Sequence, residues 1–493
     1  MRRSSAVIAT AVLGLAAVFT SPGAQAAPGD TGLAVGGLHH VGRWITDSAG
    51  RVVVLHGLNQ VFKLPPYEPS ADGFSDDDAA FLAANGFDAV RVGVIWAAVE
   101  PQPGVYDDSY LDSINDTVRT LAAHGIVSLL DFHQDQYNEK FQGEGAPAWA
   151  VPPSSAPNPQ LGFPYNYLAN PAEWQVWDRF WNNYKAPDGI GLQDHLAAAW
   201  AHVAQRFVGD HAVAGYEVLN EPWPGTLAEI CATPLIGCRA FDAGKLTAFY
   251  KRIDHAIRAA DTTHTVYVEP NAEFTQASTT GLGALGDSNA GFAYHDYCST
   301  ESFFHTNLLC QQEDELTVSA ANRYATNHGM PPLLTEFGAT TDLKNITEMV
   351  QLADKYRTGW LEWAYTGHDP TSSSPDGQAL VLDPSQSPTG SNVLTDKLKA
   401  LATPYPQVVA GTPTSWSFSG GVFRLVYSTT HATGLGRFAA GAQTRISTPA
   451  IEFPSGYQVA VTGATVASAP NAPVLVVSAL PGATTIRVTV QSR

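Results

Sequence analysis

The chain has 493 residues, 44% of them hydrophobic, and carries a formal net charge of −19. This length allows one large domain with a well-filled core and a second, smaller one. The negative charge argues against nucleic acid and anionic lipid headgroups as natural partners, because both would repel the protein, so a neutral substrate is expected.

The first residues have the pattern of a secretory signal peptide, which we assign to residues 1–26. Arg2 and Arg3 precede an apolar run over 6–19, and Ala24-Gln25-Ala26 forms a small-residue cleavage site. The apolar run is too short for a membrane span. We therefore expect the mature protein to be secreted and extracellular.

Four cysteines fall into two close pairs in the sequence. In an exported chain such pairs favour local disulfides, here Cys231–Cys238 and Cys298–Cys310. The cysteines lack the tight C-x-x-C spacing and the clustered histidines of a zinc site, so no metal is expected.

From residue 52 onward, short β-branched runs alternate with longer segments of helical period. The predicted strands cover 52–59, 87–96, 126–133, 214–221, 264–270, 291–297, 332–338 and 360–366. Eight strands with intervening helices predict an α/β fold, a (β/α)8 TIM barrel, over residues 30–405.

Two regions depart from this repeat. Residues 136–190, between the third strand and its helix, are rich in Pro, Asn and aromatic residues, and long loops of this kind surround the active face of a barrel. From 408 to 493 the composition shifts to Val, Thr, Ser and Gly with two-residue alternation, which predicts a small C-terminal antiparallel β-sandwich domain.

Polar residues collect at the ends of the predicted strands, where the active site of a TIM barrel lies. They are Asn59, Lys63, Arg91, Asp131, His133, Asp135, Asn220, Glu221, His295, Asp296, Tyr297, Glu336, Glu362 and Trp363. Glu221 on strand four and Glu336 on strand seven would face each other across the barrel mouth. Such a pair of carboxylates suggests glycoside cleavage.

The motifs around these residues resemble, in order and spacing, the signature of glycoside hydrolase family 5, over roughly residues 40–405. The matching motifs are "RVGVIW", "DFHQD", "VLNEPWPG", "YHDY", "LLTEFG" and "LEWAYTG". The resemblance implies that Glu221 is the acid/base and Glu336 the nucleophile. It also assigns supporting roles in substrate binding to Arg91, His133, Asn220, His295, Tyr297 and Trp363.

A narrower resemblance is to bacterial endoglycoceramidases, which release the intact glycan from glycosphingolipids. It is carried by "LHGLNQVFK", "DFHQDQYNE" and "EWQVWDRFWNN". It implies that Lys63 and Asp135 hold sugar hydroxyls and that Trp177, or its neighbour Trp174 or Trp181, lies near the leaving group. The segment "EWAYTGHDPTSS" is more similar to a branch that prefers galactosylceramide-type substrates.

Other interpretations remain open. A single Glu at a strand end can cap a helix or pair with an arginine, and the aromatic insertion can pack on itself. A non-catalytic carbohydrate- or lipid-binding barrel would be expected to lack one of the two glutamates, and both are present. Within the enzyme class, the alternatives are a β-glucanase or mannanase and a β-glycosidase acting on another soluble or sterol glycoside.

The sequence therefore predicts a secreted, monomeric glycosidase that cleaves the β-bond between glycan and ceramide with retention of configuration. Its carboxyl groups should lie about 5 Å apart. It should need no cofactor or metal and bind no nucleic acid, and it should contact a membrane or micelle surface transiently to reach a glycolipid.

Overall fold

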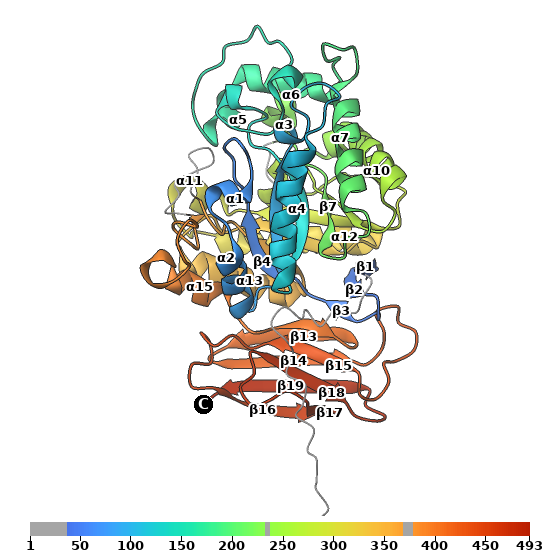
Figure 1. Cartoon of the computed structure of the whole chain (residues 1–493), viewed down its shortest axis with the longest axis vertical. Coiled ribbons are helices and arrows are strands. Elements are labelled where there is room, and N and C mark those ends of the chain that lie inside the picture. The colour runs from blue at the N-terminus through green and yellow to red at the C-terminus, as the bar shows by residue number, and fades with distance from the viewer. Residues whose placement is uncertain (1–36, 232–236, 368–377) are drawn as a thin grey trace, which may run out of the picture.

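The computed structural model of the chain describes residues 37–231, 237–367 and 378–493 (Figure 1). The predicted signal peptide lies outside these residues. Within them, no helix combines the length and apolar character that a membrane crossing requires.

Eight parallel strands close into a barrel, in the order β10-β11-β4-β5-β6-β7-β8-β9. Their bounds are β4 His56–Gln60, β5 Ala89–Ile95, β6 Val127–His133, β7 Val213–Glu217, β8 Thr265–Val268, β9 Ala290–Asp296, β10 Pro332–Phe337 and β11 Gly359–Glu362. Each overlaps one predicted strand, so the predicted TIM barrel is confirmed.

Helices surround the barrel, and their apolar faces cover the strands. The longer ones are α2 Asp76–Ala84, α4 Asp108–Ala123, α7 Leu192–Phe207, α10 Thr247–Ala260, α12 Cys310–His328, α13 Leu343–Tyr356 and α15 Thr395–Leu401. In α4, the Asp107 side chain caps the first turn, and Leu111, Ile114, Val118 and Leu121 form a fully buried stripe at helical spacing.

Shorter helical segments lie in the connections. They are α1 Pro69–Asp72, α3 Trp96–Val99, η1 Glu139–Phe141, η2 Ala148–Ala150, η3 Gly225–Leu227, α8 Ala228–Cys231, α9 Arg239–Phe241, η4 Asp242–Leu246, η5 Ala272–Thr275, α11 Ser299–Phe304 and η6 Gly390–Asn392. The connection from β8 to β9 contains η5 in place of a full-length helix, so this turn stays close to the barrel mouth.

The first predicted strand, 52–59, is divided in the structure. β3 (Val52–Val53) pairs with β12 (Tyr405–Val409), whereas β4 belongs to the barrel. Together with β1 (Leu38–Val41) and β2 (Trp44–Asp47), β3 forms one edge of the C-terminal domain's larger sheet. One continuous apolar run thus serves two sheets.

The C-terminal domain is an antiparallel β-sandwich, as predicted. Its larger sheet adds β15 Gln443–Ser447, β18 Val474–Ala479 and β17 Ala464–Val466 to β1, β2, β3 and β12, and its smaller sheet contains β13 Thr412–Ser419, β14 Val422–Ser428, β19 Thr485–Ser492 and β16 Tyr457–Thr462. Trp416, Phe423, Leu475 and Val488 are among the buried residues between the sheets.

This sandwich lies at the end of the barrel where the strands begin, opposite α5 (Tyr165–Ala169) and α6 (Pro171–Trp181) (Figure 1). The Tyr405 hydroxyl donates to the Gly86 carbonyl at 2.9 Å, and Trp416 Nε1 donates to Asp354 of α13 at 2.5 Å. The barrel mouth therefore remains free of the second domain.

Candidate active site

The carboxyl ends of the strands open into a cavity of about 650 Å³. Both predicted catalytic glutamates line it, together with Lys63, His133, Asp135, Asn220, Tyr297 and Trp363. Arg91 and His295 lie just beneath, buried but in contact with the glutamates. The structure thus brings together ten of the eleven site residues predicted from sequence, Trp177 being the exception.

The two glutamates reach the cavity from opposite sides of the barrel. Glu336 lies near the end of β10, after a register irregularity between Leu334 and Glu336. Glu221 lies four residues beyond β7 with a positive φ of 44°, so the strand ends earlier than predicted and the backbone turns the side chain into the mouth. A carboxylate oxygen of each and a ring nitrogen of His295 lie within 4.8 Å of one another. This agrees with the separation of about 5 Å that retaining glycosidases use.

Two donors hold the Glu336 carboxylate in place. Arg91 Nη1 donates to Oε1 at 2.5 Å, and the Tyr297 hydroxyl donates to Oε2 at 2.9 Å. These two hydrogen bonds fix the orientation of the carboxylate, the group that would attack carbon. Burial, and then the charge of Glu336, raise the pKa of Tyr297 well above its usual value, so the phenol keeps its proton and remains a donor.

Arg91 is itself fixed by an acidic cluster, of which only Asp131 is among the polar residues predicted at strand ends. Its Nε donates to Glu217 at 2.9 Å, and its Nη2 approaches Asp131 at 3.0 Å. Burial raises the pKa of Glu217, but the Arg91 charge outweighs this and lowers it overall. Burial and the neighbouring Glu217 raise the pKa of Glu269 well above its usual value, so this fourth carboxyl carries a proton. Arg91 thus lies at the centre of several acids, and not all of these acids carry a charge.

His295 connects the two glutamates. Its Nδ1 lies 2.9 Å from Glu221 Oε1 and 3.5 Å from Glu336 Oε2. Burial lowers the pKa of His295, but the charges of Glu336 and Glu221 raise it overall. The imidazole therefore orients the acid/base candidate rather than acting in its place.

Lys63, Asp135, His133 and Trp363 form one wall of the cavity. Lys63 forms an ion pair with Asp135 and lies 4.3 Å from the centre of the Trp363 ring. His133 stacks on the same indole at 5.3 Å, and Trp363 Nε1 donates to Gln378 Oε1 at 2.9 Å. Charged donors and acceptors beside a flat indole are the groups that bind sugar hydroxyls and the apolar face of a sugar ring.

Another wall of the same cavity is apolar. It consists of Phe163, Pro164, Tyr167, Leu168, Trp223 and Phe303. The first four come from the predicted aromatic insertion, which thus supplies part of the cavity surface.

Trp177 does not belong to this wall. It is 1% exposed and lies in α6 one layer behind the cavity, against Tyr137 at 5.0 Å and Trp181 at 5.7 Å. Trp181 is also buried, and its Nε1 donates to the Trp223 carbonyl at 2.7 Å. The α6 tryptophans therefore support the wall from behind, and the insertion both packs on itself and lines the site.

Three groups of buried or half-buried His, Asp and Glu side chains bring their ligand atoms within 4.8 Å of one another: His133, Asp135 and Glu144; Glu217, Glu269 and His295; and Glu221, His295 and Glu336. Several of these acids pair with the protein's own cations: Asp135 pairs with Lys63, and Glu217 and Glu336 pair with Arg91. These contacts describe an ion-pair network around a carboxylate pair.

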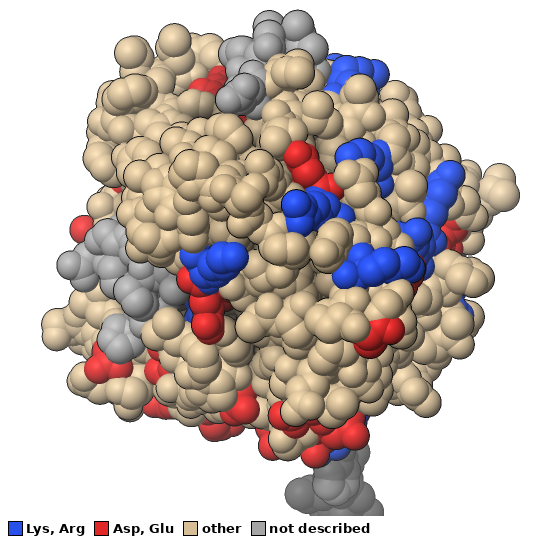
Figure 2. All heavy atoms as spheres, turned by 90° about the horizontal axis from the view of Figure 1, so that it is seen from above, with Lys and Arg blue, Asp and Glu red and all other residues tan. Residues whose placement is uncertain are grey.

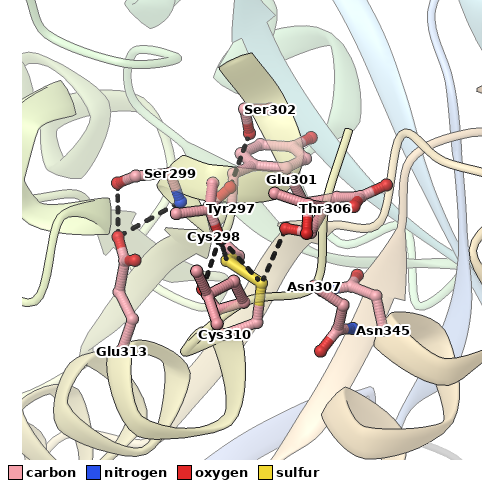
Figure 3. The surroundings of a disulfide bond; sticks show 12 residues. Tyr297, Cys298, Ser299, Glu301, Ser302, Thr306, Asn307, Cys310, Glu313 and Asn345 are labelled. Carbon is pink, nitrogen blue, oxygen red and sulfur yellow. Dashed lines mark hydrogen bonds between the residues drawn. A yellow bond between two sulfur atoms is a disulfide. The ribbon is translucent and has the colours of Figure 1, made fainter. Parts of the chain in front are cut away.

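Both predicted disulfides are present, with Cα–Cα distances of 4.6 Å for Cys231–Cys238 and 5.2 Å for Cys298–Cys310. Cys298 directly follows Tyr297, and the second disulfide joins the start of α11 to the start of α12 (Figure 3). Ser299 donates its hydroxyl to Glu313 in the same region. The disulfide therefore anchors the segment that carries Phe303 next to the residue that holds the nucleophile candidate.

Comparison with known proteins identifies the family. Residues 47–369 match the family model described as Cellulase (glycosyl hydrolase family 5), and residues 404–490 match the glycoside hydrolase family 5 C-terminal domain. The chain belongs to glycosyl hydrolase family 5. With both carboxylates in place, this family 5 protein is a glycoside hydrolase.

Individual relatives of this family 5 hydrolase are endoglycoceramidases. Endoglycoceramidase I of Rhodococcus hoagii (strain 103S) is 34% identical over 459 residues, covering 89% of this chain and 85% of the relative. The lactosyl-enzyme intermediate of endo-glycoceramidase II from Rhodococcus sp. superposes with a TM-score of 0.73 at 30% identity, covering 91% and 99% of the two chains. The ganglioside GM3 complex of the same enzyme gives 0.72 at 28% identity, with the same coverage.

Proposed function

We propose that this family 5 hydrolase cleaves the β-glycosidic bond between the glycan and the ceramide of glycosphingolipids, with retention of configuration. The observation that carries the proposal is the lining of the cavity that holds the carboxylate pair, which combines a polar wall containing Lys63 and Asp135 with an apolar wall containing Phe163 and Phe303. A substrate that is a sugar on one side of the scissile bond and a lipid on the other fits both walls.

The geometry supports a double displacement. Glu336, held by Arg91 and Tyr297, attacks the anomeric carbon and forms a glycosyl-enzyme ester. Glu221 gives its proton to the departing ceramide oxygen in the same step. Glu221 then takes a proton from water, and the resulting hydroxide attacks the anomeric carbon, which releases the glycan and restores the Glu336 carboxylate. The lactosyl-enzyme of the Rhodococcus enzyme supports a covalent intermediate in a relative.

Contact with a membrane or micelle is part of the proposal, because ceramide does not leave a bilayer readily. Phe304, Leu308 and Leu309 are 75%, 62% and 62% exposed, and they follow Phe303 in sequence. Tyr165 and Leu168 of α5 are 54% and 47% exposed, and Leu168 lines the cavity. Figure 2 shows a broad area of this end of the molecule without charged side chains. Exposed apolar groups of this kind mark surfaces that bind partners or lipid.

Three further properties are proposed on the sequence. The pattern of residues 1–26 supports export to the extracellular space. The segment that follows Trp363 supports a galactosylceramide-type head group, and part of it, 368–377, lies outside the described residues. We propose that the enzyme acts as a monomer, which size-exclusion chromatography with light scattering tests.

The decisive experiment compares substrates. The protein should hydrolyse short-chain galactosyl-, glucosyl- or lactosylceramide in detergent micelles and release the intact glycan, with little turnover of soluble β-glucan or mannan. The reverse preference would identify a polysaccharide hydrolase of the same family. NMR of the first-formed sugar should show the β-anomer.

A variant of the apolar wall sharpens this test. Phe303→Ala should lower kcat/KM for a glycosylceramide about tenfold, which corresponds to about 1.4 kcal/mol of lost binding to the transition state. Hydrolysis of a small aryl glycoside should change much less. Leu343→Ala is the matched control, because Leu343 is similarly exposed, at 39% against 38%, but does not line the cavity.

A further inference from the structure

Glu273 is a pocket-lining carboxyl to which the mechanism above assigns no role. It lies in η5, the turn that follows β8, and its side chain lines the cavity beside Trp223 and Ala272. It is only 4% exposed. Within residues 37–231, 237–367 and 378–493, its buried Oε2 has no hydrogen-bond partner.

The backbone around Glu273 is rigidly held, so the orientation of the side chain is built into the fold. Asn271 Oδ1 accepts from the Glu273 amide at 3.1 Å, and the Ala272 amide donates to the Pro222 carbonyl at 3.2 Å, next to Glu221. At the other end of the turn, the Tyr297 amide donates to the Thr275 hydroxyl at 2.7 Å. The turn is thus tied to the segments that carry both Glu221 and Tyr297.

A carboxyl in this position is unfavourable for the free protein. A buried polar group without a partner costs free energy, and most buried polar groups in proteins are satisfied. Burial, and then the charge of Glu221, raise the pKa of Glu273 to about 7. Below this pH the group has both an O–H donor and an acceptor oxygen to offer to a ligand.

The position of Glu273 indicates which part of a ligand it meets. Glu273 lies on the side of the cavity formed by Pro222 and Trp223. It is close enough to Glu221 for the charge of that carboxylate to raise the pKa of Glu273. Glu221 is the residue that protonates the leaving group, so Glu273 lies on the aglycone side of the scissile bond. The second and third carbons of the ceramide backbone beyond that bond carry an amide N–H and a hydroxyl, whereas a simple alkyl chain carries neither.

We propose that Glu273 determines aglycone specificity by hydrogen-bonding the amide and hydroxyl groups of the lipid backbone next to the cleaved bond. This inference rests on the proposed function. It assigns to one side chain the distinction between a ceramide and an apolar alcohol of similar bulk, because burying its carboxyl against a plain alkyl chain leaves the carboxyl without a hydrogen-bond partner.

The test compares two variants on two aglycones that carry the same glycan. Glu273→Leu should lower kcat/KM for a glycosylceramide about 10- to 100-fold, as expected for hydrogen bonds to an ionisable group, and leave the octyl glycoside within about twofold or improve it. Glu301→Gln is the control, because Glu301 also lines the cavity but already accepts from the Thr340 hydroxyl at 2.7 Å. It should not change the ratio between the two substrates.

A substrate analogue tests the same hydrogen bonds from the side of the ligand. A ceramide whose amide nitrogen is methylated and whose hydroxyl is removed should be a poorer substrate for the wild type, by about the same factor, and should lose nothing further with Glu273→Leu. The thermal midpoint of the free Glu273→Leu protein should stay the same or rise, since an unsatisfied buried carboxyl has been replaced by a side chain of similar size.

Equal losses on both aglycones, or a shifted pH profile common to both, would overturn the proposal and make Glu273 a residue that only tunes Glu221 or supports the fold. A lowered thermal midpoint with equal losses would do the same. If the wild type cleaves the octyl glycoside and soluble glucans but no glycosylceramide, the proposed function itself fails, which is a separate outcome.

Discussion

Ala89 and Arg91 lie two residues apart on the same barrel strand, β5, yet they belong to opposite environments. Ala89 packs with Leu129, Ala293 and Leu361 in an apolar cluster at the floor of the barrel. Arg91 lies in the acidic cluster at the mouth. Alternate residues of a strand face the same side of the sheet. Leu361 of β11 and Trp363 just beyond it therefore both face the barrel interior, Leu361 at the floor and Trp363 at the mouth.

The floor and the mouth of the barrel interior therefore have different roles. The floor is sealed by Leu38 and Ile45 of the β1–β2 hairpin, and the cluster there is aliphatic apart from Tyr267. The mouth concentrates buried charge, which is costly to desolvate and strongly destabilising when one partner is removed. Apolar packing at the floor thus stabilises the fold, and this stability offsets the cost of holding buried charged groups at the mouth.

The largest expected effect is at the nucleophile. Glu336→Gln should reduce kcat by more than about 10⁴-fold on every glycoside, beyond the range of acid–base contributions, because no other carboxylate is placed to attack the anomeric carbon. Thermal unfolding of the variant should remain cooperative. Residual activity within tenfold of the wild type would contradict the assignment of the nucleophile.

Glu221→Gln should lose about 10²- to 10⁴-fold on a substrate with a poor leaving group, the usual size of a general-acid contribution. A glycoside of an acidic phenol needs little protonation, so its first step should proceed and the glycosyl-enzyme should accumulate, as intact-protein mass spectrometry would show. Losses as large on this activated aryl glycoside as on the glycosylceramide would contradict the division of roles between the two glutamates.

Leu129→Ala tests the floor. Leu129 is 2% exposed in β6, so the variant should lose about 2 to 5 kcal/mol of unfolding free energy in urea titrations, while kcat of the folded enzyme stays unchanged. Leu435→Ala, at a site 79% exposed, should remain within about 0.5 kcal/mol of the wild type. A large fall in kcat at Leu129 would show that the floor and the mouth are not independent.

The smallest effect concerns pH. Burial and Lys63 lower the pKa of His133, but Asp131 and Asp135 raise it to about 9. Because this pKa is raised above the unfolded value of about 6.5, the stabilisation is complete below pH 6.5 and is lost as the pH rises through about 9. The unfolding free energy should fall over this window in the wild type and fall less in His133→Gln. Parallel curves for both proteins would show that the His133 charge does not contribute.

The fold could be predicted because its signals are local. Hydrophobic runs and helical periodicity define the eight strands and the helices without knowledge of distant contacts. The division between β3 and β4 could not be predicted, because Val52 and Val53 pair with Val409 and Val408, near the other end of the chain. A continuous apolar run does not show which of two sheets each half will join.

The site was predicted where residues follow strand ends and missed where only packing decides. Glu217 interrupts an apolar run, and an acid in a buried strand signals a buried cation, so its pairing with Arg91 was within reach of the sequence. Trp177 was assigned to the cavity because spacing alone does not tell which face of α6 turns inward. No sequence pattern singles out Glu273, because its distinguishing feature, a buried Oε2 without a hydrogen-bond partner among the described residues, arises only in the folded chain.

The hairpin at the floor also imposes an order on biosynthesis. β3 has its sheet partner in β12, and the sandwich has its remaining strands after that. As the ribosome makes the chain from the N-terminus, the hairpin strands emerge first and wait for most of the polypeptide before their sheet can form. The hairpin of β1 and β2 can form early, but β3 is among the last strands to gain its second neighbour, and the joining of this N-terminal segment to the sandwich is a late event in folding.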